Sequence, residues 1–182
     1  MSISLCRAGR RLALAALCAA TAAATTGAFA QTPPSLDPAL LVLAEQETPA
    51  VIETLRMLTS HDTGTMQGAG LLALATDIER FAKGLGAEVD RVTPAANVPG
   101  ANLVITFKGT GKRKIMLMAH MDTVYPAGTA AAKPLRVEGN RAIAPGIADD
   151  KGGIAVFLHA MKLLKARGFN DYERVTMVFN VD

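Results

Sequence analysis

Apolar residues recur at helical spacing in three stretches of the chain, 39–60, 71–85 and 151–167. Within each stretch they lie mostly three or four positions apart, which places them on one face of a helix. Gly86 follows the second stretch and Gly168 the third, and glycine commonly ends a helix. We therefore expect three amphipathic helices.

Shorter apolar runs bounded by turn residues predict strands at 103–107, 115–119 and 175–181. The run 115–119 has no polar alternation, which is typical of a strand covered on both faces. A small hairpin is expected between residues 135 and 143, turning at 138–140.

The helix over 151–167 lies between the last two of these strands, so the three elements form a β–helix–β unit. Such a unit predicts a parallel strand pair with a right-handed crossover. We therefore expect an α/β fold with a mostly parallel central sheet and flanking helices.

Polar side chains stand where the expected strands and helix meet one edge of this sheet. His120 and Asp122 follow one strand, Asp149 and Asp150 precede the helix, and Asp182 follows the last strand. Ligands of such sheets bind at the carboxyl ends of the strands. The spacing therefore brings polar side chains from three separate stretches to one edge.

These residue types suit a metal site. Residues i and i+2 of extended backbone point the same way, so Asp122 can accept a hydrogen bond from one imidazole nitrogen of His120 and leave the other for a metal. A carboxylate such as Asp149 can bridge two cations, which two-metal hydrolases hold ~3.5–4 Å apart. The alternatives are a solvated histidine at a strand end and acids that cap a helix. Of the other histidines, we expect His61 in a loop and His159 solvated or paired.

The first thirty residues have the pattern of a secretory signal. The pair Arg10-Arg11 precedes an apolar run, 12–20, and a stretch of small residues ends in Ala28-Phe29-Ala30. We expect cleavage after Ala30, a leader over 31–48, and a periplasmic or secreted protein. The alternative is a buried N-terminal helix.

Composition narrows the possible partners and ligands. The 182 residues carry a formal net charge of +3, and the excess lies in residues 1–30, which hold arginines and no acid. The remainder is balanced, so we expect no nucleic-acid partner and no membrane partner after signal removal. Cys6 and Cys18 both lie in the signal. Any metal must therefore be held by histidines and carboxylates.

Three segments occur in order, Ala119–Val124, Pro145–Gly153 and Phe179–Asp182. Together they resemble the zinc exopeptidases of the glutamate carboxypeptidase and aminoacylase family, most closely its secreted bacterial glutamate carboxypeptidases. The resemblance extends from about Pro49 to Asp182.

This resemblance implies that His120 is a zinc ligand, that Asp149 bridges two zinc ions, and that Asp122 is a catalytic residue that orients His120. It implies hydrolysis of a C-terminal amide bond, with N-acyl-glutamates of the folate type as the leading substrates. Related aminoacylases, dipeptidases and deacylases share the motifs, so a small peptide or another N-acyl amino acid is the alternative substrate. The family also implies a homodimer for the full-length enzyme.

The family pattern continues beyond Asp182 with two glutamates, the general base and a zinc ligand, and later with a further acidic ligand and a histidine ligand. We therefore expect residues 49–182 to be the N-terminal half of a metallopeptidase catalytic domain, without the dimerisation domain and the C-terminal half. We expect the 182-residue chain to be inactive by itself.

Overall fold

A computed structural model describes residues 37–95 and 97–181. The expected secretory signal and Asp182 lie outside these residues. The helices are α2 (Pro38–Thr59), α3 (Gly68–Gly84), α4 (Thr129–Ala132) and α5 (Gly152–Ala166). The strands are β1 (Glu88–Val92), β2 (Asn102–Lys108), β3 (Lys114–His120), β4 (Arg136–Glu138), β5 (Arg141–Ile143) and β6 (Arg174–Asn180). A wide turn, η1 (Ile147–Lys151), leads into α5. None of the helices in this described part has the length and apolar character needed to cross a bilayer.

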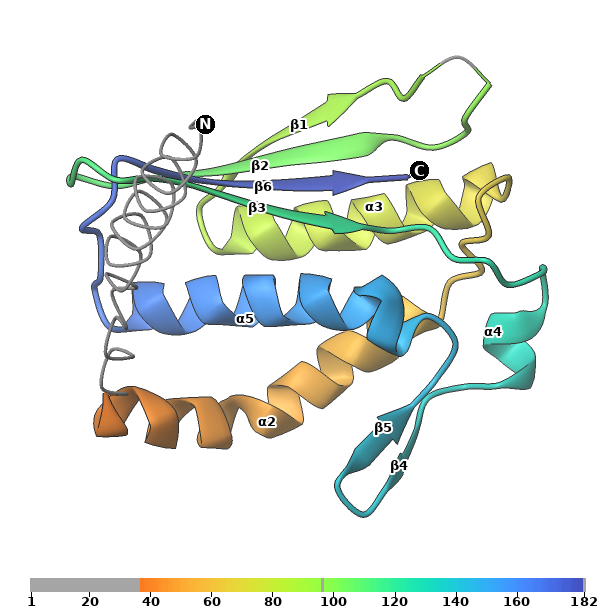
Figure 1. Cartoon of the computed structure of the whole chain (residues 1–182), viewed down its shortest axis with the longest axis horizontal. Helices are drawn as coiled ribbons and strands as arrows, with labels where there is room; N and C mark the ends of the chain where they lie inside the picture. The colour runs from red at the N-terminus through yellow and green to blue at the C-terminus, as the bar shows by residue number, and fades with distance from the viewer. Residues whose placement is uncertain (1–36, 96, 182) are drawn as a thin grey trace, which may run out of the picture. The chain divides into compact units, whose positions relative to one another are not determined.

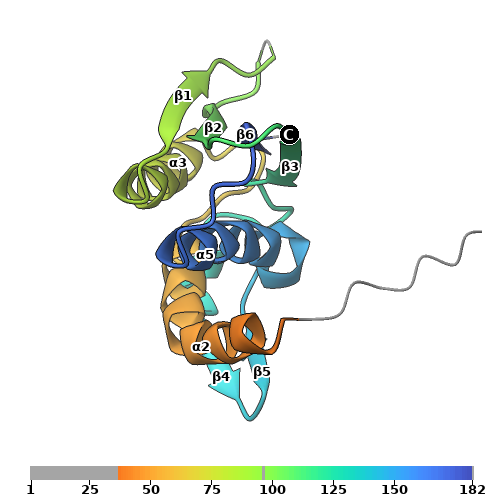
Figure 2. The ribbon, with the colours of Figure 1, turned by 90° about the vertical axis from the view of Figure 1, so that its left-hand side faces the viewer.

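The larger sheet has the strand order β1-β2-β6-β3, and β4 and β5 form the expected separate hairpin. Strands β3 and β6 pair in parallel, so the expected β–helix–β unit is confirmed. The α/β class with flanking helices is also confirmed, and Figures 1 and 2 show α3 and α5 on one side of the sheet and α2 beneath α5.

The expectation of a mostly parallel sheet is wrong for the described strands. Strand β2 pairs antiparallel with both β1 and β6. Only residues 109–113 join β2 to β3, and so short a connection reverses the chain direction, whereas a parallel pair needs a long crossover. Among the described strand connections, the one from β3 to β6, which contains α5, provides such a crossover.

The hydrophobic core lies between the sheet and the helices. The inward-facing residues of the two central strands are fully or almost fully buried: Leu103, Ile105, Phe107, Val175, Met177 and Phe179. They pack with buried residues of the three long helices, including Leu58, Leu74, Ile78, Ile154 and Leu158. Apolar residues recur every second position in the strands and every third or fourth position in the helices, and this spacing places them in one core.

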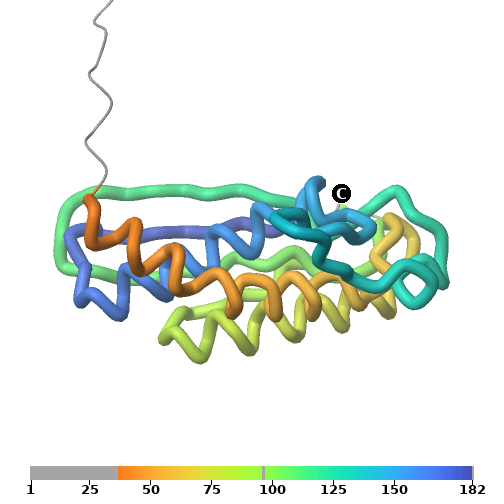
Figure 3. The backbone as a smooth tube through the Cα atoms, turned by 90° about the horizontal axis from the view of Figure 1, so that it is seen from below, coloured from red at the N-terminus to blue at the C-terminus, as the bar shows by residue number. Residues whose placement is uncertain are grey.

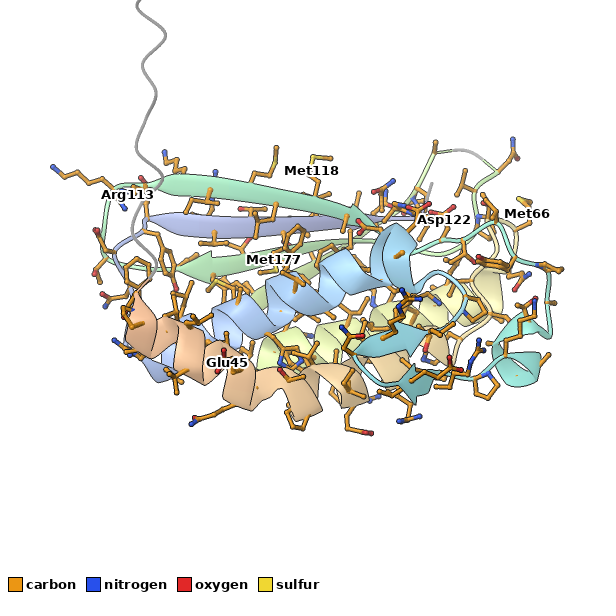
Figure 4. All side chains as sticks on the ribbon, turned by 60° about the horizontal axis from the view of Figure 1, so that its bottom comes forward. Glu45, Met66, Arg113, Met118, Asp122 and Met177 are labelled. Atoms are coloured by element: carbon orange, nitrogen blue, oxygen red, sulfur yellow. The ribbon has the colours of Figure 1, made fainter. Side chains whose placement is uncertain are left out.

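The outer face of β3 is not covered by any described helix. Met118 is 60% exposed and points away from the helices in Figure 4, whereas Met177 of the neighbouring strand lies between the sheet and α5. The expectation that the 115–119 strand is covered on both faces is therefore wrong within the described residues. An apolar run indicates a preference for burial, but it does not specify which element provides the cover.

Helix α2 begins at a side-chain cap. The Asp37 carboxylate accepts the backbone N–H of Ala39 at 2.9 Å, and Pro38 occupies the first turn, where its missing N–H costs nothing. The helix continues through Pro49, so the expected boundary between residues 48 and 49 falls inside it.

Three loops gather at the carboxyl end of β3. They comprise residues 60–67, 121–128 and 144–151, and Figures 1 and 3 show them at the same end of the molecule. A backbone bond from the Thr123 N–H to the Thr63 carbonyl at 2.7 Å joins two of them, and the Lys151 ammonium, which donates to the His61 carbonyl at 3.2 Å, joins the third. The expected polar edge of the sheet is therefore a meeting point of loops distant in sequence.

Candidate active site

His120 ends β3, and its imidazole ring lies between two carboxylates. Its Nδ1 stands 3.2 Å from Asp122 Oδ1 and 3.2 Å from the Asp122 carbonyl oxygen. Its Nε2 stands 2.8 Å from Asp149 Oδ1. The structure thus brings together the three residues that the sequence singled out, and each imidazole nitrogen faces a different carboxylate.

Asp149 is presented by the turn η1 rather than by a helix. Its backbone is extended, with φ −148° and ψ 92°, and its peptide bond to Asp150 is cis. Its side chain is 88% exposed. No side chain caps the N-terminus of α5, which argues against the alternative that these acids serve as a helix cap.

Gly146 shapes the start of this turn. Its φ is 70°, a value that favours glycine, and a Cβ there would stand 2.5 Å from the Cγ2 of Thr123. The turn can therefore approach the loop after β3 closely only because position 146 lacks a side chain.

Both carboxylate oxygens of Asp122 are engaged. While Oδ1 faces His120, Oδ2 accepts a hydrogen bond from the Thr65 hydroxyl at 3.0 Å. The side chain of Asp122 is only 14% exposed, so its orientation is fixed by protein groups more than by water.

The surroundings of His120 act on its pKa in opposite directions. Partial burial acts to lower it, whereas the hydrogen bonds and charges of Asp149 and Asp122 act to raise it. The carboxylates outweigh burial, and the pKa of His120 lies above its ordinary value. The pair of carboxylates therefore creates a site that favours positive charge at the imidazole.

A hollow of about 190 Å³ opens beside this cluster. It is lined by the cluster itself, by the loop after β3 and by the start of η1: His120, Asp122, Thr123, Val124, Tyr125, Ala144, Gly146, Ile147, Ala148 and Asp149. Val124 is 94% exposed at its rim. The cluster is thus open to a small molecule and bordered by apolar side chains.

The donors fit one part of a zinc site. Two tetrahedral zinc ligands at ~2.0–2.2 Å from the metal stand about 3.4 Å apart. The 2.8 Å between His120 Nε2 and Asp149 Oδ1 is close to this, and the exposed Asp149 side chain is free to adjust. Within residues 37–95 and 97–181, however, no group of three or more histidine, cysteine or acidic side chains could hold a metal ion. The described residues therefore provide a pair of donors, and a metal held there would need further ligands from other residues.

Sequence reasoning missed two residues that support the site, Lys151 and Asp62. Lys151 is 2% exposed, and its ammonium donates to the His61 carbonyl at 3.2 Å. Burial lowers its pKa to about 8, against the opposing effect of the Asp62 charge. A lysine at a helix N-terminus is unfavourable for the helix dipole, and that feature of the sequence could have drawn attention to it.

Asp62 ties the loop before α3 to the loop after β3. Its carboxylate accepts the backbone N–H groups of Gly128 at 2.7 Å and Ala130 at 2.9 Å. The hydrogen bond from Ala130 and then that from Gly128 hold the pKa of Asp62 below its ordinary value. No local pattern in the sequence indicates this contact, because the partners are more than sixty residues away.

The imidazoles of the other two histidines face partners outside the cluster. His61 is in a loop, as expected, and its Nε2 faces Asp77 at 2.8 Å. His159 is paired with Glu47 at 2.7 Å and Thr54 at 2.8 Å, but it is buried rather than solvated. Helix α2 covers that side of α5, which the sequence of α5 alone does not indicate.

Known proteins share both the sequence and the fold. Residues 116–182 match the model of peptidase family M20/M25/M40. Over 172 residues the chain is 46% identical to carboxypeptidase G2 from Pseudomonas sp. (strain RS-16), covering 94% of this chain and 40% of that protein. The chain thus spans less than half the length of this relative.

Solved structures of peptidases have the same fold. A tripeptidase from Staphylococcus aureus superimposes with a TM-score of 0.60 at 25% identity, covering 71% of this chain and 35% of that one. Human carnosine dipeptidase 1 gives a TM-score of 0.64 at 14% identity, covering 77% of this chain and 33% of that one, and this likeness concerns the fold alone. Residues 116–182, which include His120, Asp122 and Asp149, therefore match peptidase family M20/M25/M40, and the 46% identity to carboxypeptidase G2 extends the similarity over nearly the whole chain.

Proposed function

We propose that this chain contributes part of the active site of a dizinc metallo-carboxypeptidase that hydrolyses a C-terminal amide bond. The observation that carries the proposal is the 2.8 Å approach of His120 Nε2 to Asp149 Oδ1, with Asp122 behind the imidazole. The 46% identity to a carboxypeptidase supports the reaction class.

Each residue of the cluster has a distinct task in this proposal. His120 Nε2 and the Asp149 carboxylate would hold the metal, and Asp149 would have a second oxygen to offer another ion. Asp122 keeps the proton on Nδ1, so that the Nε2 lone pair faces the metal. Bound zinc supplies Lewis-acid polarisation of the scissile carbonyl and lowers the pKa of water to about 7.

The hollow beside His120 accommodates a group next to the scissile bond. Its rim offers apolar contact from Val124 and Tyr125, and among residues 37–95 and 97–181 no lysine or arginine lines it. It therefore suits the acyl side of a substrate better than the terminal carboxylate. We propose N-acyl-glutamates of the folate type as substrates, with other N-acyl amino acids, dipeptides and tripeptides as the alternatives to test.

A chimera tests the proposal directly. This chain replaces the matching 40% of carboxypeptidase G2, and zinc content and turnover of a folate-type N-acyl-glutamate are measured. We expect His120→Ala and Asp149→Ala each to lower turnover by more than about 100-fold and to lower zinc content, because losing a ligand is worse than losing its supporting partner, which costs 10–100-fold.

Two variants serve as matched controls. His61→Ala removes an imidazole that faces Asp77. Asp171→Ala removes a carboxylate that is 65% exposed, on the loop between α5 and β6. Both should keep zinc and turnover within a few-fold of the parent. Unchanged zinc content and turnover in the His120 and Asp149 variants would refute the ligand roles. Preferred turnover of dipeptides or N-acetyl amino acids would overturn the substrate class and leave the metal site intact.

A further inference from the structure

The loop that carries Thr65 is held in place by its backbone. The Thr63 carbonyl accepts the Thr123 N–H at 2.7 Å, and Gly64 pairs in parallel with Thr123. The Gln67 N–H closes the turn on the Gly64 carbonyl at 2.7 Å. A Cβ on Gly64 would stand 2.6 Å from the Tyr125 carbonyl oxygen, so this close approach requires glycine. The position of Thr65 therefore does not depend on its own hydroxyl group.

The hydroxyl group of Thr65 instead serves Asp122. It donates to Asp122 Oδ2 at 3.0 Å, while Oδ1 of the same carboxylate stands 3.2 Å from His120 Nδ1. Rotation of the carboxylate away from His120 would break the bond to Thr65. We propose that Thr65 is a positioning residue that keeps Asp122 aimed at His120, and through it keeps the Nε2 lone pair aimed at the metal site; this rests on the proposed function.

The burial of Asp122 makes this contact decisive. At 14% exposure the carboxylate has little water to replace a lost donor, and a polar group that loses its partner when largely buried reorients or is destabilised. Partners that orient a metal-binding histidine typically contribute 10–100-fold to metal affinity. Thr65 acts one step further back and fixes the orienting group itself.

The test uses the metal-free chain first. Nuclear magnetic resonance of ¹⁵N-histidine detects the His120 Nδ1 proton, which is slow to exchange when hydrogen-bonded. Thr65→Val keeps the shape of the side chain and removes its hydroxyl, so we expect the Nδ1 proton signal to broaden or vanish. Thr65→Ser restores the hydroxyl and should restore the signal.

Thr76→Val is the matched control. The Thr76 hydroxyl lies on the exposed side of α3, where it donates to the Leu72 carbonyl at 2.8 Å and accepts a hydrogen bond from Arg91 at 2.9 Å, and neither partner belongs to the cluster. It should leave the Nδ1 proton signal of His120 unchanged. Should Thr65→Val not fold, Thr65→Ala removes the same hydroxyl without adding a methyl group, and it carries the same expectation.

Zinc affinity is measured in the second step, in the carboxypeptidase G2 chimera. We expect Thr65→Val to weaken zinc binding by 10–100-fold, with Thr65→Ser close to the parent. A Thr65→Val protein with an unchanged Nδ1 signal and a zinc affinity within twofold of the parent would overturn the inference. Failure of the parent to bind zinc would refute the proposed function, whereas the signal of the metal-free chain would still report on Thr65.

Discussion

A partly buried network of hydrogen bonds, one of them an ion pair, joins α2 to α5, and its loss should be measurable. Glu47 on α2 accepts hydrogen bonds from His159, at 2.7 Å, and from Lys162, both on α5. The imidazole of His159 is 5% exposed, and its other nitrogen faces Thr54 at 2.8 Å. We expect Glu47→Gln to keep the shape of this network and to remove its negative charge.

The size of the stability loss follows from how exposed the two partners of Glu47 are. A hydrogen bond to a charged group contributes about 1.5–3 kcal/mol and a neutral one about 0.5–1.5 kcal/mol. The buried bond to His159 therefore loses about 1 kcal/mol. Lys162 is 39% exposed, so its ion pair adds at most about 1 kcal/mol after solvent screening. We expect Glu47→Gln to lower the free energy of unfolding by about 1–2 kcal/mol at pH 7.

The stability difference between the parent and Glu47→Gln should depend on pH, and the pKa of Glu47 gives the direction of that dependence. The hydrogen bond from Lys162, more than any other favourable contact, holds the pKa of Glu47 below its ordinary value of 4.5. A carboxylate with a lowered folded-state pKa stabilises the protein above its unfolded pKa, and this contribution is lost as the pH falls through the folded pKa. The difference between the parent and Glu47→Gln should therefore be full at pH 7 and shrink below pH 4.5.

Urea unfolding of the chain, followed by circular dichroism at several pH values, measures both effects. Glu53→Gln is the matched control, because Glu53 lies on the same helix, is 71% exposed and stands 3.5 Å from Arg56. It should change stability by less than about 0.5 kcal/mol. Equal stability of the parent and Glu47→Gln at pH 7, or a difference that persists unchanged at acid pH, would contradict the reasoning.

Two further outcomes are expected. Gly146→Ala forces a side chain into a positive-φ position against Thr123 and should cost at least ~1–2 kcal/mol in urea unfolding. Gly84→Ala, at the end of α3 with nothing within 4 Å of its Cβ, should instead stabilise by up to ~1 kcal/mol; equal effects would contradict the role of φ. Export of the chain in a bacterial host should yield a mature N-terminus at Gln31, read by mass spectrometry, and an exported protein that retains residues 1–30 would rule out the signal.

Much of the fold was predictable because it depends on the local spacing of apolar residues along the chain. The buried faces of α3 and α5 follow from spacings of three and four, and the parallel pairing of β3 with β6 follows from the long helical connection between them. Strand β1, with the polar sequence Glu88–Val92, was not predicted, because its stability comes from pairing with β2 rather than from an apolar run of its own.

The candidate site likewise has one part that the sequence predicts and one part that it does not. His120 and Asp122 are two residues apart on extended backbone, so the sequence predicts that their side chains point the same way. Asp149 precedes the helix that follows this strand, so the sequence also places it at the same edge of the sheet. Only the tertiary structure placed the Thr65 hydroxyl on Asp122 and the Lys151 ammonium on the His61 carbonyl, 57 and 90 residues apart in the chain. A hydrogen bond between loops depends on where each loop is anchored, and a single hydroxyl or ammonium group leaves no periodic trace in a sequence.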